Sequence, residues 1–348
     1  MWHQLTSFEN LWNAWLAASR GKRSTPDVAE FETSVEANLF ALQRALTDGS
    51  YQPGGYRSFL IHDPKRRLVS AAPFIDRVVH HALVRVIEPT FEATFIGDSY
   101  ANRIGKGTHA AVEQAQRWSR HYEFVLQCDI RQFFPSVDHA ALLKVLSRKI
   151  TCERSLALCA QILASGDGVL GNEYDMVYFP GDDLLASTRP RGLPIGNLTS
   201  QFWSNVLMNE IDQLAKRTLH CKAYLRYVDD FLLFADDKKT LWAWKAAIRD
   251  KLTAMRLTLH EKSSTVYPCA NGIGFLGQRI FPTHRRLKTR NARAFEARLR
   301  EWQIEFAQGR LTLEEISQRV RGWVAHAEHA HTVGLRTKIF NKPWKKSP

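Results

Sequence analysis

The stretch YLRYVDDFLLFADD at residues 224–237 places two adjacent carboxylates, Asp229 and Asp230, inside an apolar run typical of a buried strand. Like charges one residue apart repel each other and lose hydration when buried, so a continuous core strand would disfavour them. The segment is long enough for two short strands joined by a tight turn. A turn at Val228 and Asp229 would present both carboxylates at the tip of a hairpin and keep the apolar flanks buried.

A third carboxylate ends another predicted strand. EFVLQCD at residues 123–129 reads as a buried strand that finishes at Asp129. Carboxylate oxygens suit Mg²⁺, with Mn²⁺ as a substitute ion, and three carboxylates from neighbouring strand ends could hold two ions roughly 3.5 to 4 Å apart. Such a pair of ions serves phosphoryl transfer, so the pattern indicates nucleotidyl transfer.

Paired aspartates also mark ordinary turns, and the chain has two further pairs. Asp182 and Asp183 lie in a turn-rich insertion, whereas Asp236 and Asp237 precede a helical pattern and are expected to cap it. Only Asp229 and Asp230 have strong apolar strand on both sides. On spacing alone, a metal site and a structural turn remain open as alternatives for that pair.

The periodicity predicts an α+β fold. Helices are expected over residues 8–20, 30–47, 197–217 and 241–255, and a further helix is expected to begin at Ser136 as its N-cap. Strands are expected over 123–129, 223–235 and 257–260, and a mixture of strands and turns over 50–73. This order suits an antiparallel sheet with helices on one face, as in a split βαβ arrangement.

Composition points to a polyanionic partner. The formal net charge is +13, and residues 285–348 hold 15 Lys and Arg against 6 Asp and Glu. A basic segment of this kind favours nucleic acid over a merely solvated face. The five cysteines have no metal-binding spacing, and the apolar runs are too short to span a membrane, so we expect a cytoplasmic protein without a membrane partner.

Seven motifs in a fixed order resemble those of reverse transcriptases. They are DPKRRLVSAAPFIDRVVHHAL, FIGDSYANRIGKGTHAA, QCDIRQFFPSVDH, RGLPIGNLTSQ, YVDD, LTLHEKSS and IGFLGQRI, spread over roughly residues 50–285. The form LPIGNLTSQ, where other lineages commonly carry LPQG, is similar to that of diversity-generating retroelements. YVDD alone would be weak evidence for the family, whereas seven motifs in the family's order are a specific signature.

The resemblance implies a right-hand polymerase. The N-terminal extension and fingers would occupy 1–119, a ferredoxin-like palm 120–284 with a fingers-side insertion at about 150–190, and a basic helical thumb 285–348. His326, His329 and His331 in that thumb lack acidic or cysteine partners at useful spacing, so we expect a polar helical surface there.

The resemblance also assigns site residues. It implies metal ligands at Asp129, Asp229, Asp230 and the backbone carbonyl of Ile130; a proton donor at Lys262; deoxynucleotide contacts at Lys65, Arg66, Arg67, Phe134, Ile195 and Gly196; and a primer grip at Phe275, Leu276 and Gly277. Phe133 or Phe134 should be core, since two adjacent aromatic rings rarely both reach a site.

The partners implied by this family are template RNA, the RNA–cDNA duplex, dNTPs and a small basic oligomeric accessory variability protein. An isoleucine at 195 replaces a hydrogen-bonding glutamine beside the nascent base pair, so we expect Ile195 and Arg67 to contribute to errors at template adenines. Two alternatives stay open: a retron-like or group II intron-derived enzyme of ordinary fidelity, and a catalytically inactive RNA-binding scaffold. An adenine-biased error spectrum would distinguish the mutagenic enzyme from the first alternative, and primer extension would distinguish an active polymerase from the second.

Overall fold

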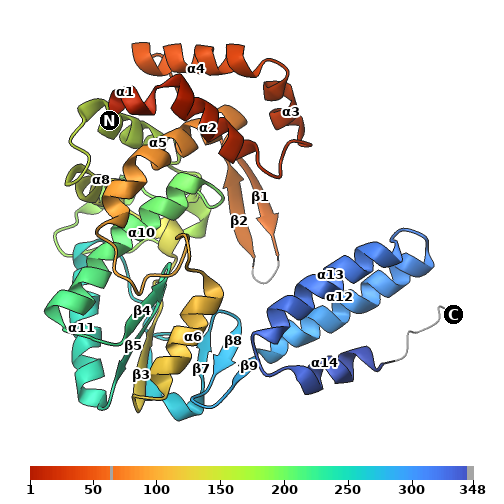
Figure 1. Ribbon diagram of the computed structural model, residues 1–348. Coiled ribbons are helices and arrows are strands. Elements are labelled where there is room, and N and C mark those ends of the chain that lie inside the picture. Colours follow the sequence, from red (N-terminus) through yellow and green to blue (C-terminus); the bar gives the residue numbers. More distant parts are fainter. Residues whose placement is uncertain (63–65, 343–348) are drawn as a thin grey trace.

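The computed structural model describes residues 1–62 and 66–342, which form a hand-like arrangement of three parts (Figure 1). The N-terminal part contains helices α1 (Trp2–Leu5), α2 (Phe8–Ser19), α3 (Pro26–Glu32), α4 (Val35–Asp48) and α5 (Phe74–Glu92), and strands β1 (Arg57–Ile61) and β2 (Arg67–Ala71). The region 30–47, expected to be one helix, belongs to two helices, α3 and α4, because the helical conformation is interrupted at Thr33 and Ser34.

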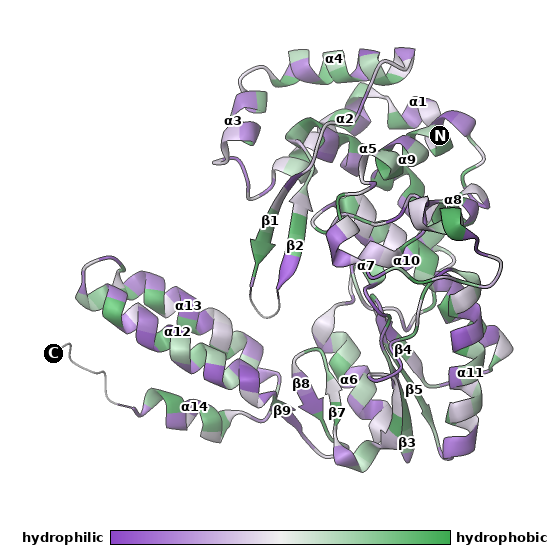
Figure 2. Cartoon of the chain, turned by 180° about the vertical axis from the view of Figure 1, so that it is seen from behind, coloured by the Kyte–Doolittle hydropathy of each residue, from purple (hydrophilic) through white to green (hydrophobic). Residues whose placement is uncertain are grey.

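The β1–β2 hairpin extends away from these helices towards the thumb (Figure 1). Its strands pair in antiparallel register, with Phe59 opposite Val69. β1 is apolar (Figure 2), yet Phe59, Leu60 and Ile61 are all exposed. The hairpin is therefore a projecting finger rather than part of the core.

The central part is built on a four-stranded antiparallel sheet with strand order β4-β5-β3-β6. Its elements are α6 (Thr108–Ser119), β3 (Phe124–Cys128), α7 (Phe133–Ser136), α8 (His139–Ser147), α9 (Glu153–Ser165), α10 (Leu198–Gln213), β4 (Tyr224–Tyr227), β5 (Asp230–Ala235), α11 (Lys238–Ala254) and β6 (Thr265–Pro268). Short 3₁₀ turns occupy Gly171–Glu173, Leu184–Thr188 and Cys269–Asn271.

Both faces of this sheet are covered, and the expectation of helices on one face was wrong. Leu126, Phe231 and Leu233 pack into the large core that also holds residues of α10 and α11. Val125, Leu232 and Phe234 point the other way, into a second core with α6 and β7–β8 residues. Strand residues alternate between faces, so two apolar faces explain why the strands read as continuous apolar runs.

Two local expectations about helix starts had different outcomes. Asp237 caps α11 as predicted, since its side chain accepts a hydrogen bond from the Thr240 amide at 2.7 Å. Ser136 does not cap a helix: it ends the short α7, and the N-cap of α8 is Asp138, whose side chain accepts from Ala141. Residues 257–260 do not form the predicted strand but contribute one bridge, Leu259 with Ile130.

The thumb follows a second, three-stranded antiparallel sheet of β7 (Ile273–Phe275), β8 (Gln278–Ile280) and β9 (Arg285–Leu287). It consists of α12 (Thr289–Ala307), α13 (Leu313–Glu328) and α14 (Val333–Phe340). α13 begins with a full capping box between Thr312 and Glu315. Phe295 of α12 stacks on Trp323 of α13 with ring centroids 3.7 Å apart, which joins the two long helices.

The thumb histidines do not form a merely polar surface. His329 stacks on His109 of α6 with ring centroids 3.4 Å apart, and His326 lies 6.0 Å from the same ring. His331 instead accepts a hydrogen bond from the Arg285 amide at 3.2 Å. His326 and His329 thus join the thumb to α6, and His331 joins it to β9. The sequence could not reveal these contacts because the partners lie more than 40 residues away.

Across the described parts of the chain, every helix is too short or too polar to span a bilayer.

Candidate functional site

The two adjacent carboxylates lie at a hairpin tip, as the sequence predicted. β4 and β5 pair with Tyr227 opposite Asp230, and Val228 and Asp229 form the turn between them. Val228 has φ of +59°, which is a true outlier for a β-branched residue. Such a conformation costs about 1 to 3 kcal/mol and persists only where its surroundings enforce it.

Asp129 reaches the same edge of the sheet from the neighbouring strand. β3 pairs with β5 so that Cys128, the last residue of β3, lies opposite Phe231, and Asp129 follows it near the start of β5 at Asp230. The backbone of Asp129 is fixed by two contacts: its amide donates to Ser264 Oγ at 3.3 Å, and its carbonyl accepts from the His260 amide at 2.8 Å. Three carboxylates from two strands therefore lie together.

This closeness changes the acidity of the tip. Burial, followed by the charge of Asp129, raises the pKa of Asp229 to about 6. Burial, followed by the charges of Asp229 and Asp129, raises the pKa of Asp230 to about 7. Grouped anionic oxygens of this kind are relieved by a divalent cation, so the donor set fits Mg²⁺ or Mn²⁺.

The side chains as placed do not form a finished metal site. Within residues 1–62 and 66–342, no three His, Cys, Asp or Glu side chains gather tightly enough to hold an ion. We therefore keep as predictions the ligand roles of Asp129, Asp229, Asp230 and the Ile130 carbonyl. The carboxylate side chains would have to move closer together to bind an ion.

A pocket of about 500 Å³ opens in front of Asp229 and Asp230. The predicted residues that line it are Arg66, Arg67, Phe134, Ile195, Asp229, Asp230 and Leu276. They come from the β1–β2 hairpin, α7, the loop before α10, the β4–β5 tip and the β7–β8 turn. Phe133 is buried in the core and Phe134 is half-buried, and both border the pocket, so the expectation that at least one of the two rings is core is confirmed.

Strained backbone is concentrated around this pocket. Gln132, Val228 and Leu276 all line it, and all three have positive φ without being glycine. Gly196 has φ of +115°, and a Cβ there would lie 2.9 Å from Val69 Cγ1. Unfavourable conformations gather at sites where geometry serves function rather than stability.

Other predicted residues lie elsewhere. Lys65 falls outside the described residues. Lys262 is exposed in a turn and does not line the pocket, and Phe275 is fully buried in the second core, where it supports the strand.

The two arginines of the pocket differ in their partners. Arg66 pairs with Glu173 at 3.0 Å. Arg67 lies close enough to Asp229 to lower the pKa of that carboxyl, against the larger effect of burial.

The loop before α10 is tied to the finger hairpin by one buried side chain. Asn197 donates through Nδ2 to the Ser70 carbonyl at 2.8 Å and the Pro194 carbonyl at 3.0 Å, and its Oδ1 accepts from the Ala72 amide at 3.2 Å. The Ser70 amide in turn donates to the Ile195 carbonyl at 2.8 Å. These bonds hold Ile195 in fixed register with the strand that carries Arg67.

The most important residue that the sequence analysis missed is Arg226, which is fully buried. Its guanidinium donates two bonds to the Asp212 carboxylate, both at 2.7 Å, and one each to Asn205, Ser99 and the Val228 carbonyl, all at 3.0 Å. All five of its N–H donors are thus used. An arginine inside an apolar strand is the signal that could have exposed this, because a buried charge requires a partner.

The first of the two aspartates in the insertion, Asp182 and Asp183, also has a structural role. The Asp182 side chain is buried, and it accepts hydrogen bonds from Arg189 and Arg256 at 2.5 and 2.6 Å and from the Phe179 amide at 2.9 Å. It fastens the insertion to the chain after α11 and contributes nothing to the pocket in front of Asp229.

An antiparallel palm sheet with three carboxylates at its edge, facing cations from a finger hairpin, defines a nucleotidyltransferase with the right-hand polymerase fold. The chain belongs to the reverse transcriptase (RNA-dependent DNA polymerase) family, whose profile matches residues 61–280. It is therefore an RNA-directed DNA polymerase by family, and the predicted fold class is confirmed.

Two curated relatives and one solved structure illustrate the similarity. Protein YkfC of Escherichia coli is 25% identical over 298 residues, which are 72% of each chain. The group II intron-encoded protein LtrA of Lactococcus lactis is 24% identical over 182 residues, 51% of this chain and 28% of LtrA. Apo telomerase from Candida tropicalis has a TM-score of 0.50 at 11% identity, over 69% of this chain and 49% of that chain, and shows the fold alone.

Proposed function

We propose that this chain copies an RNA template into error-prone cDNA, with errors concentrated at template adenines, for targeted gene diversification by mutagenic retrohoming. Asp129, Asp229, Asp230 and the Ile130 carbonyl would hold two Mg²⁺ ions, which would supply charge stabilisation to the attacking and leaving oxygens. The convergence of three carboxylates at one edge of the sheet, two of which line the pocket, supports this chemistry.

The chain's own residues would prepare the reactants. Arg66 and Arg67 from the finger hairpin would bind the triphosphate, as fixed positive charge opposite the carboxylates offsets charge that develops during transfer. Phe134 would exclude a 2′-hydroxyl, and Leu276 with Gly277 would hold the primer end. Lys262 would need its turn to move towards the pocket in order to protonate pyrophosphate.

The single observation that carries the mutagenic part is the environment of Ile195. Ile195 lines the same pocket as Arg67, its carbonyl accepts a hydrogen bond from the Ser70 amide, and Asn197 holds the carbonyl of the neighbouring Pro194. A rigid apolar wall cannot donate or accept a hydrogen bond near the nascent pair, so mismatched geometry is penalised less than it would be by a glutamine. The resemblance of LPIGNLTSQ to the motif of diversity-generating retroelements implies that errors fall at adenine. It also implies that the partner is a small basic accessory protein.

Primer extension on RNA with sequenced products tests the proposal. Ile195→Gln should lower misincorporation opposite adenine several-fold, whereas the apolar control Ile195→Leu should leave the spectrum unchanged. If the Gln variant misincorporated opposite adenine as often as the wild type, Ile195 would have no part in the infidelity. Asp229→Asn should abolish incorporation altogether, and extension by that variant would overturn the catalytic assignment.

A second candidate is an intron-type reverse transcriptase of ordinary fidelity. The observation that favours it is the similarity to LtrA over 182 residues. An error spectrum without adenine bias, in the presence of any accessory protein encoded beside this chain, would select this candidate.

A further inference from the structure

A polar side chain interrupts the apolar strand β3 two residues before Asp129. Gln127 is half-buried, whereas its neighbours Leu126 and Cys128 are fully buried in the core. Since side chains of a strand alternate between faces, Gln127 points to the face of the palm sheet that packs against α6 and the β7–β8 hairpin. A glutamine on such an apolar face is costly unless its amide is hydrogen-bonded, so its partners indicate its role.

Two hydrogen bonds fix the orientation of the Gln127 amide. Its Oε1 accepts from the Tyr267 hydroxyl at 2.7 Å, and its Nε2 donates to the Gly274 carbonyl at 3.1 Å. Burial raises the pKa of Tyr267 to about 12, so this hydroxyl keeps its proton and remains a donor. Because only the amide oxygen can accept that proton, the nitrogen is held on the other side, and its second N–H is available to a third partner.

The third neighbour of this amide is Asp230. Gln127 pairs with Leu232, two residues along β5 from Asp230, so the side chains of Gln127 and Asp230 lie diagonally on one face of the sheet. Burial has the largest effect on the pKa of Asp230 and raises it, whereas a hydrogen bond with the Gln127 side chain acts in the opposite direction. Since β3 lies between β5 and β6, Asp230, Gln127 and Tyr267 form a row across three strands.

The same amide contacts the strand that leads into the predicted primer grip. Gly274 lies in β7 directly before residues 275–277. The turn that follows is fastened to the start of α12, because the Lys288 amide and the Asn291 side chain donate to the Gly277 carbonyl at 3.1 and 3.2 Å. A primer end that displaced this turn would move the Gly274 carbonyl, and with it the Gln127 amide that faces Asp230.

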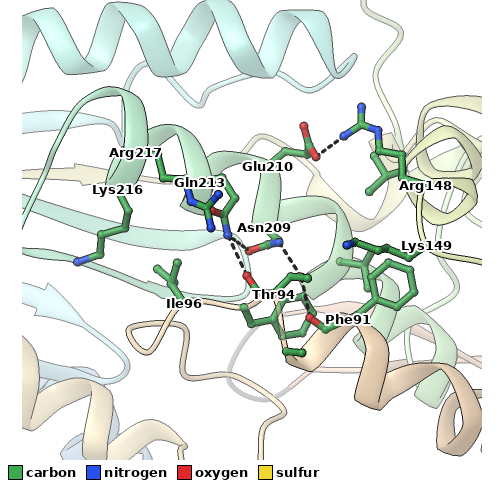
Figure 3. A pocket seen from close by; sticks show the side chains of 14 residues that line it. Phe91, Thr94, Ile96, Arg148, Lys149, Asn209, Glu210, Gln213, Lys216 and Arg217 are labelled. Atoms are coloured by element: carbon green, nitrogen blue, oxygen red, sulfur yellow. Dashed lines mark hydrogen bonds and ion pairs between the residues drawn. The ribbon is translucent and has the colours of Figure 1, made fainter.

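Side-chain amides also bridge elements elsewhere in the chain (Figure 3). Gln213 of α10, half-buried like Gln127, donates through Nε2 to the Thr94 carbonyl at 2.9 Å and to Asn209 Oδ1 at 3.1 Å. These bonds join α10 to the loop after α5, and none of these three residues lines the pocket in front of Asp229. Gln213 is therefore a bridging glutamine remote from the carboxylates, and it provides a matched control for Gln127.

We propose that Gln127 is a positioning residue that holds the Asp230 carboxylate for metal binding and couples it to the primer grip. The second N–H of Nε2 donates to one carboxylate oxygen, which leaves lone pairs on both oxygens for a divalent ion. Loss of such a partner typically weakens metal binding by about 10- to 100-fold. Since the metal and the primer end would depend on the same amide, each should strengthen binding of the other. The inference rests on the metal-dependent polymerase activity proposed above.

The first measurement is Mn²⁺ affinity, with free Mn²⁺ counted by electron paramagnetic resonance and no nucleotide present. Gln127→Met keeps the length of the side chain and removes its donors, so the affinity should fall about tenfold or more. Gln213→Met removes the same kind of bridge and should leave the affinity unchanged. The double variant Asp229→Asn with Asp230→Asn gives the background from other Mn²⁺ sites on the protein.

The second measurement repeats the titration with a primer–template whose primer ends in a dideoxynucleotide. The duplex should raise the Mn²⁺ affinity of the wild type and of Gln213→Met about fivefold, but that of Gln127→Met less than about twofold. A glutamine with a merely structural role would not produce this difference between folded variants. Tyr267→Phe removes the 2.7 Å bond to Gln127 Oε1 and keeps the amide, so it should weaken Mn²⁺ binding about threefold and serves if denaturant unfolding shows that Gln127→Met is unfolded.

Several results would overturn the inference. Equal Mn²⁺ affinity in the wild type and Gln127→Met would exclude the positioning role, and tighter binding in that variant would show that the amide competes with the ion. An unchanged effect of the duplex in Gln127→Met would exclude the coupling. If the wild type bound no Mn²⁺ above background, the metal site would fail and the role of Gln127 with it. A wild type that binds Mn²⁺ as expected but extends no primer would count against the polymerase proposal alone.

Discussion

At the residue scale, Arg226 explains how a strained hairpin tip can exist. A β-branched residue with positive φ relaxes unless its neighbours hold it, and the Arg226 guanidinium bonds directly to the Val228 carbonyl from a fully buried position. The Asp212 carboxylate neutralises that charge through two bonds. Because Asp229 follows Val228, the orientation of a carboxylate that we predict to be catalytic depends on a side chain that does not line the pocket.

Arg226→Lys should separate positioning from folding. Lysine has three donors on one atom and cannot reproduce the five-bond fork, so we expect the free energy of unfolding to fall by about 3 kcal/mol. At a temperature where the variant remains folded, kcat should fall at least tenfold while KM for dNTP changes little. Denaturant unfolding and steady-state extension measure the two effects.

Tyr224→Phe provides the matched control for this residue. It removes the 2.6 Å bond from the Tyr224 hydroxyl to Asp212 but leaves the bond to Val228 intact. We expect a loss of about 1 to 2 kcal/mol in stability with kcat within twofold of the wild type. If kcat fell equally in both folded variants, Arg226 would have no special role at the tip.

At the element scale, the loop before α10 and the strand β2 act as one unit. Asn197→Ala removes three buried hydrogen bonds, two of which join the loop to the β2 segment, so Arg67 and Ile195 should lose their fixed register across the pocket. We expect KM for dNTP to rise about tenfold, with a stability loss of roughly 2 kcal/mol. Ser58→Ala, which removes only the 2.8 Å bond between Ser58 and Ser70, should leave KM unchanged. A similar KM shift in both variants would mean that general loosening of the hairpin, rather than register, is responsible.

The elements that the sequence predicted are those with local causes. The hairpin at Val228 and the cap at Asp237 follow from residues that are neighbours in sequence. The second helical layer on the sheet and the stacking of His109 on His329 depend on segments far apart in the chain, so periodicity could not reveal them. Arg226 was overlooked because its partner Asp212 lies on a different element, where it reads as an ordinary helix residue.

At the scale of the whole molecule, a buried histidine links stability to pH. His80 lies in the middle of α5 with 1% of its surface exposed, and its Nδ1 is buried without a partner among the described residues. Burial, followed by the charges of His81 and Arg77, lowers the pKa of His80 to about 3. The folded protein therefore keeps this ring neutral over a range in which the unfolded chain, with a pKa near 6.5, binds a proton.

The sign of the effect follows from proton uptake. Above pH 7 neither state binds the proton and His80 has no influence, whereas below about 6.5 only the unfolded chain gains it, so stability falls with falling pH. From pH 7 to 5 the loss from His80 should be about 2 kcal/mol. Asp76 acts in the opposite direction, because burial raises its pKa. The quantity to measure is therefore the difference in unfolding free energy between wild type and His80→Leu at each pH.

That difference should shift by about 2 kcal/mol in favour of the leucine variant between pH 7 and pH 5, since leucine fills a similar volume and cannot titrate. His3→Leu, at an exposed position on α1, serves as the control and should show no such shift. Parallel stability profiles for wild type and His80→Leu would mean that the ring gains its proton without unfolding, through local opening of α5. Because α5 packs against both α2 and α10, such an opening would uncouple the N-terminal helices from the palm, and activity would then be lost in acid before the palm unfolds.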